Sequence, residues 1–70
     1  MFQPGDIVAL TKTLGRLGRE GQLYKVLDIT KFTGSIMLQN MKNGLEFYVH
    51  PYEVRPATKL ERVLIGADSE

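Results

Sequence analysis

Short apolar runs alternate with turn residues along the first 57 positions of the chain. Four runs are rich in β-branched and aromatic residues and too short for ordinary helices, and they span residues 7–10, 23–29, 35–39 and 45–49. A fifth, very short strand is predicted just before Pro56, because proline cannot donate a ladder hydrogen bond and therefore ends or edges a strand. The pattern predicts an all-β fold, a small barrel of about five antiparallel strands.

The run at 45–49 shows the clearest alternation of apolar and polar positions. Leu45, Phe47 and Val49 fall on one face of this predicted strand, and Tyr48 falls on the other. We therefore expect Phe47 in the core. The pair Asn43-Gly44 precedes this run, and both residue types tolerate the positive φ of a tight turn, which predicts a hairpin between the third and fourth strands. The first and third runs are apolar on both faces, so alternation does not assign their inward side.

The pattern changes after Pro56. Thr58 and Glu61 have the spacing of a helix capping box, and Gly66 can cap the C-terminal end. A short helix here would place three apolar side chains on one stripe, which are Leu60, Val63 and Leu64. Residues 62–65 are also a plausible extra strand. We divide the chain into a barrel at 1–57 and an extension at 58–70, a packed helix or strand followed by a frayed end.

Size and charge exclude some classes of protein but do not identify one. The chain has 70 residues, no Cys and one His, so neither a disulfide nor a histidine-based metal site can staple the fold. A packed core or a homo-oligomer must supply the stability. The net charge is only +1, but residues 10–31 hold five basic and two acidic side chains, a local charge of +3. This asymmetry indicates either a solvated surface or a face that meets an anionic partner.

The chain offers little for catalysis. It contains two Ser residues, Ser35 in a predicted turn and Ser69 near the end, and its single histidine, His50, has no obvious partner. We expect no enzymatic activity, no cofactor and no metal. The N-terminus lacks a basic segment before an apolar stretch, and no apolar run approaches the roughly 20 residues needed to cross a bilayer. We expect a cytoplasmic protein that does not enter membranes.

A glycine-spaced basic segment precedes the second predicted strand. Gly15, Gly18 and Gly21 recur at a spacing of three and permit a close approach of a partner to the main chain. Arg16 and Arg19 lie between them and can bind phosphate or carboxylate groups. The segment is also an ordinary hairpin connection in composition, so a purely structural role stays open. It is not a phosphate-binding P-loop, because the Gly-Lys-Ser/Thr ending is absent.

Aromatic residues bear on the choice of partner. Nucleic-acid-binding barrels stack bases on exposed aromatic rings beside basic side chains. Candidates for such rings are Tyr24, Phe32, Tyr48 and Tyr52, although Tyr24 and Phe32 are favoured as core residues. The same rings could line a peptide groove, because apolar anchors with Arg neighbours also suit protein interfaces.

Three segments resemble the KOW and SH3-like family of ribosomal proteins and transcription elongation factors. Residues 2–8 match an F-x-x-G-D-x-V opening, residues 15–23 form a glycine-spaced basic loop before a strand, and residues 52–56 match an x-x-V-x-P exit. The resemblance covers about 55 of the 70 residues. It implies a small SH3-like barrel that binds nucleic acid or a ribonucleoprotein.

Two hypotheses follow for the function. The first is a nucleic-acid-binding module whose contact residues are Lys12, Arg16, Arg19, Lys25, Lys31, Phe32 and Tyr48. The second is a protein-interaction module, such as a small accessory or phage-type regulatory protein. It would engage a larger protein or a second copy through an edge strand or through the segment that carries Leu60, Val63 and Leu64.

Overall fold

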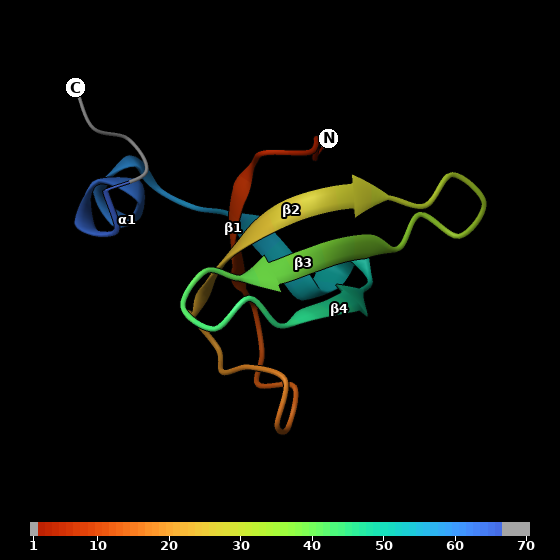
Figure 1. Cartoon of the computed structure of the whole chain (residues 1–70), viewed down its shortest axis with the longest axis horizontal. Helices are drawn as coiled ribbons and strands as arrows, with labels where there is room; N and C mark the ends of the chain where they lie inside the picture. The colour runs from red at the N-terminus through yellow and green to blue at the C-terminus, as the bar shows by residue number, and fades with distance from the viewer. Residues whose placement is uncertain (1, 67–70) are drawn as a thin grey trace.

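The computed structural model describes residues 2–66, which form one antiparallel sheet and a short helix (Figure 1). The strands are β1 (Ile7–Leu10), β2 (Leu23–Ile29), β3 (Ile36–Asn40), β4 (Glu46–Val49) and β5 (Val54–Pro56). A 3-10 helix, η1 (Pro51–Glu53), precedes β5, and an α-helix, α1 (Lys59–Leu64), follows it. The expected fold class, all-β with about five antiparallel strands and a short C-terminal helical turn or extra strand, is confirmed, with the helix as the form that the C-terminal segment takes.

The strands are ordered β4-β3-β2-β1-β5 across the sheet, so β1 lies between strands from the middle and the end of the chain. No ladder joins β4 to β5 within the described residues 2–66, so hydrogen bonding does not close the barrel. Val8, Ala9 and Leu10 of β1 are all buried. The run is therefore buried on both faces, in agreement with its apolar character on both.

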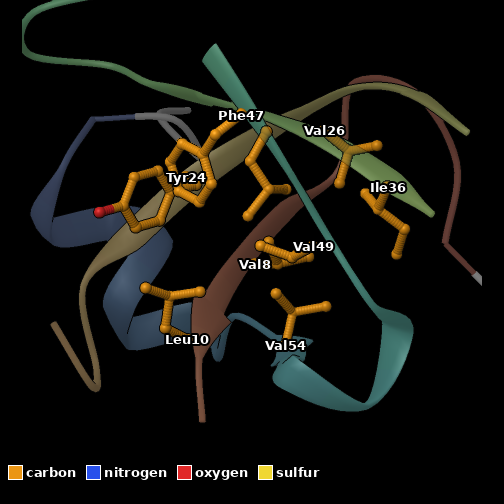
Figure 2. Close-up of a cluster of buried hydrophobic side chains, with 9 residues drawn as sticks. Val8, Leu10, Tyr24, Val26, Ile36, Phe47, Val49 and Val54 are labelled. Carbon is orange, nitrogen blue, oxygen red and sulfur yellow. The ribbon is translucent and has the colours of Figure 1, made fainter. Parts of the chain in front are cut away.

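The core lies on the concave face of the curled sheet and draws side chains from all five strands (Figure 2). Tyr24 and Phe47 are its aromatic pair, with ring centroids 5.3 Å apart and a T-shaped arrangement. Phe47 and Val49 are buried and Tyr48 is exposed, which confirms the predicted faces of β4. Leu45 departs from that prediction. It precedes β4, directly follows the turn, and leaves 51% of its surface exposed.

The two central hairpins share one turn design. The loop at 31–34 is closed by the amide of Thr30 donating to Ser35, and the loop at 41–44 by the amide of Asn40 donating to Leu45, each at 2.8 Å. The last loop residue, Gly34 or Gly44, has a positive φ. The hairpin before β4 is thus confirmed, but its turn is not the tight one predicted, since no residue of 2–66 other than glycine has a positive φ.

Helix α1 forms at the predicted capping box rather than as an extra strand. The Thr58 side chain accepts a hydrogen bond from the Glu61 amide at 3.1 Å, and a Glu61 carboxylate oxygen accepts one from the Thr58 amide at 2.8 Å. The stripe was expected to pack on the barrel or on a second copy, and within this chain it does not pack on the barrel. Leu60, Val63 and Leu64 are 68%, 50% and 75% exposed, because the helix stands away from the sheet (Figure 1). The predicted frayed end at 67–70 lies outside the described residues.

Polar contacts attach α1 to the sheet. The Arg55 guanidinium of β5 donates two hydrogen bonds of 2.9 Å to the two carboxylate oxygens of Glu61. This fork, aided by the Thr58 amide, lowers the pKa of the Glu61 carboxyl from an ordinary 4.5 to about 2. The attachment of the helix therefore depends on an ionised carboxylate.

We expect acid to weaken this attachment. Since the folded pKa of Glu61 lies below the unfolded one, its contribution to stability is present above about pH 4.5 and is lost as the pH falls towards 2. The expected result is that Glu61→Gln melts below the wild type at pH 7, and that the two melting curves converge near pH 2. Circular dichroism melts across this range measure the difference. A gap that stayed constant down to pH 2 would show that ionisation of Glu61 does not matter.

Candidate functional site

The β1–β2 loop, residues 11–22, is an ordered structure held by its own backbone. The amide of Leu14 donates to the Gly18 carbonyl at 2.9 Å, and the amide of Gly21 donates to Leu10 at 2.8 Å, which closes the loop at its base. Gly15 and Gly21 have φ values of +60° and +84°, so they supply left-handed conformations that other residues rarely adopt. The loop therefore holds Arg16 and Arg19 on a defined turn.

Gly18 serves a different purpose from its two neighbours. Its φ is not positive, but a β-carbon at this position would overlap the Tyr24 hydroxyl and come within 2.7 Å of Leu10 Cδ1. The Tyr24 hydroxyl donates to the Leu17 carbonyl at 3.1 Å or to Gln22 Oε1 at 2.7 Å. Because Gly18 has no side chain, the loop can pack directly against Tyr24 of the core.

A hollow of about 380 Å³ lies between this loop and the β3–β4 hairpin turn. Its arginines come from the loop, and its carboxamides come from both segments. The lining residues are Gly15, Arg16, Leu17, Gly18, Arg19, Gln22, Asn40, Asn43 and Leu45. The fold thus places the two predicted arginines beside polar side chains that are distant in the sequence. We call this site the donor hollow.

The carboxamides of the donor hollow have their oxygens already occupied. Gln22 Oε1 accepts from the Arg19 amide at 3.1 Å, Asn40 Oδ1 from the Lys42 amide at 2.8 Å, and Asn43 Oδ1 from the Leu45 amide at 2.9 Å. None of these bonds uses an NH₂ group, so each side chain keeps both of its amide donors for a ligand. Two of these bonds belong to the hairpin turn, so the contacts that shape the turn also orient the Asn40 and Asn43 side chains that line the hollow.

The arginines add to this excess of donors. Both are exposed, and within residues 2–66 no ion pair or hydrogen bond engages either guanidinium. No carboxylate lines the hollow among the described residues. Two guanidinium groups and three carboxamide NH₂ groups therefore surround one space. Such a site is chemically suited to an anion with several oxygens, such as a phosphate or a carboxylate.

The other predicted contact residues lie elsewhere. Lys12 stands near η1, with its Nζ 3.6 Å from Glu53 Oε2 and 5.8 Å from the Tyr52 ring centroid. Lys25 and Tyr48 lie in the outward-facing positions of β2 and β4 and are exposed. The sheet register places Gln39 opposite Lys25. The structure therefore does not gather all the predicted residues into one site.

Lys31 and Phe32 occupy the β2–β3 loop, at the opposite end of the sheet from the β3–β4 turn (Figure 1). The preference for a buried Phe32 is wrong, because its side chain is fully exposed. The preference for a buried Tyr24 is confirmed. Phe32 lies within a hairpin turn, where the backbone reverses and the side chain has no strand neighbour to pack against.

Two features of the surface were not found from the sequence. Asn43 carried only a turn signal and Gln22 and Asn40 carried none, yet all three line the donor hollow. His50 and Tyr52 stack with ring centroids 5.2 Å apart and nearly parallel planes, because the first turn of η1 brings them together. A spacing of two residues across a proline does not predict this contact. Only the 3-10 geometry creates it.

Comparison with protein families, with characterised proteins and with solved structures gave no match to this chain. The resemblance to the KOW and SH3-like family therefore stays a prediction based on short motifs. No helix within residues 2–66 is both long enough and apolar enough to span a bilayer.

Proposed function

We propose that this protein is a non-enzymatic binding module that contacts the phosphate backbone of a nucleic acid, free or within a ribonucleoprotein, through the donor hollow. One observation carries the proposal: Arg16, Arg19 and three carboxamides surround the hollow with guanidinium and NH₂ donors, and no carboxylate of residues 2–66 lines it. Phosphate groups offer several acceptor oxygens and a negative charge, which match this arrangement.

Removal of both arginines tests the proposal. In Arg16→Ala/Arg19→Ala, we expect weaker binding to mixed DNA and RNA oligonucleotides regardless of sequence, because phosphate contacts supply affinity rather than discrimination. The slope of log affinity against log salt should flatten by roughly 1 to 2 units, since each lost contact contributes about 0.7–0.9. Fluorescence anisotropy titrations at several ionic strengths give both quantities. Both side chains are exposed, so the fold should persist.

The matched control removes the same charge elsewhere. Lys31 lies in the β2–β3 loop and Lys59 begins α1, and both are exposed. Lys31→Ala/Lys59→Ala should change the affinity and the salt slope less than the arginine pair does. Equal effects of the two pairs would mean that binding follows overall charge and not the donor hollow. Failure of the wild type to bind any oligonucleotide at low ionic strength would contradict the proposed function itself.

The protein-interaction hypothesis keeps one supporting observation. The apolar stripe of α1, comprising Leu60, Val63 and Leu64, is exposed. Such a surface is typical of protein contacts. Sedimentation of the whole chain at increasing concentration tests association between copies, and a constant monomer mass would count against it.

A further inference from the structure

A second hollow, of about 600 Å³, lies between the β3–β4 turn and the C-terminal end of α1. Four of its lining side chains are apolar and three are polar. The lining residues are Gln22, Leu23, Asn40, Met41, Lys42, Leu64 and Ile65. Its volume is within the range of about 300–1,000 Å³ typical of small-molecule sites. We call it the helix hollow.

The helix hollow adjoins the donor hollow. Gln22 and Asn40 line both spaces, so the two hollows share a wall of carboxamide side chains. The oxygens of these two side chains are held by the Arg19 and Lys42 amides, which leaves NH₂ donors on the shared wall. A ligand that reached both hollows would therefore meet cations on one side, amide donors between, and apolar surface on the other.

Polar contacts hold the apolar side of the helix hollow in place, and no other part of residues 2–66 covers its helix side chains, which stay exposed. Helix α1 is attached through Arg55 and Glu61 and through Arg62 Nη1, which donates to the Ala57 carbonyl at 2.8 Å. These polar contacts fix the helix, so its apolar side chains are not used to hold it. Leu64 and Ile65 stay 75% and 43% exposed at the edge of the hollow.

From this arrangement we infer that the protein binds single-stranded nucleic acid, with one backbone phosphate in the donor hollow and a neighbouring base in the helix hollow. The inference rests on the proposed function and adds the strandedness of the ligand. A nucleotide joins an anionic phosphate to a base with apolar faces and a polar edge. The phosphate matches the guanidinium groups of the donor hollow, and the base matches the apolar side chains and carboxamides of the helix hollow. Asn and Gln side chains can hydrogen-bond to base edges.

Single strands follow from the position of the base. A base inside a duplex is stacked and paired, and it must leave the helix before it can enter a protein pocket. Single-stranded segments present such bases without that cost. Because the inferred site takes an unpaired base beside a phosphate, it favours single strands over duplexes with the same number of phosphates.

An abasic oligonucleotide separates the two contacts. We expect a short, labelled thymidine oligonucleotide to bind about tenfold or more tightly than an abasic oligonucleotide of equal length, consistent with the usual contribution of a base contact. A hairpin duplex should also bind more weakly than the thymidine strand. Fluorescence anisotropy measures all three. Equal affinity for the thymidine and abasic strands would overturn the inference and leave the proposed function standing. Binding to none of the probes would overturn both.

A pair of matched variants locates the base. Leu64 lines the helix hollow, whereas Leu60 lies on the same helix outside it, and both are largely exposed. Leu64→Ser should reduce the preference for the thymidine strand over the abasic strand by several-fold, and Leu60→Ser should leave it unchanged. Equal effects of the two variants would overturn the inference. A concentration-dependent dimer that both variants dissociate, with the preference unchanged, would assign this face to a protein contact and would also overturn it.

Discussion

Phe47→Ala is expected to destabilise the domain by about 3–5 kcal/mol, because truncation of a core aromatic loses transfer free energy and leaves a cavity. Phe47 is 9% exposed and meets the Tyr24 ring edge-to-face at 5.3 Å. Its loss also removes that aromatic contact. In a domain of 70 residues, whose core is small, a change of this size threatens folding. Urea unfolding followed by circular dichroism measures the free energy of unfolding.

The neighbouring residue supplies the control for this prediction. Tyr48 lies on the same strand, but its side chain projects from the outer face and is 57% exposed. Tyr48→Ala should change the free energy of unfolding by only about 0.5 kcal/mol, as is usual for surface substitutions. If Phe47→Ala cost less than about 1 kcal/mol, or no more than Tyr48→Ala, the inward face of β4 would be wrong.

Gly18→Ala is expected to destabilise the protein by about 2–4 kcal/mol, the combined effect of overpacking and a lost buried hydrogen bond. The new methyl group would overlap the Tyr24 hydroxyl and crowd Leu10. Tyr24 would have to move away from the Leu17 carbonyl and Gln22, which are its hydrogen-bond partners. Since Gln22 lines both hollows, oligonucleotide binding should weaken as well. Urea unfolding and anisotropy titrations on the same samples check both effects.

Gly15→Ala is the control of equal chemistry. Gly15 has a positive φ, but a methyl group added there would have no neighbouring atom within 4 Å, so its cost of about 1–2 kcal/mol comes from backbone conformation alone. The steric explanation for Gly18 has a second test. In a Tyr24→Phe background, where the overlapping oxygen is gone, Gly18→Ala should cost less than in the wild type. An unchanged cost would show that the hydroxyl is not the obstacle.

Much of the fold could be predicted because its signals are local. Short apolar runs, the Asn43-Gly44 turn and the Thr58/Glu61 capping box each describe contacts between residues close in sequence. The strand positions agree with the structure to within one residue. The 3-10 helix η1 was missed because three residues are too few to show a periodic pattern. Leu45 was misplaced because alternation was extended to a residue that precedes the strand.

The candidate site was predicted only in part. Arg16 and Arg19 were recognised from the glycine-spaced loop, but the carboxamides that complete the donor hollow lie on another segment. A sequence pattern does not report that the β1–β2 loop meets the β3–β4 turn. It also does not report which oxygen of an Asn side chain is already used by a backbone amide. Lys31 and Phe32 were grouped with the arginines by charge and residue type, although the fold places them at the other end of the sheet.

By itself, the sequence determined the all-β class, the positions of the strands along the chain and the absence of cysteine chemistry, because each depends on residue type and short-range spacing. It left the segment after Pro56 open between a capped helix and an extra strand. The tertiary structure alone decided that Phe32 is exposed, that the apolar stripe of α1 is left uncovered, and that two hollows share Gln22 and Asn40. These features depend on which distant segments pack together. That packing arises because apolar side chains from distant segments are buried together in one core, so no single segment of the sequence predicts it.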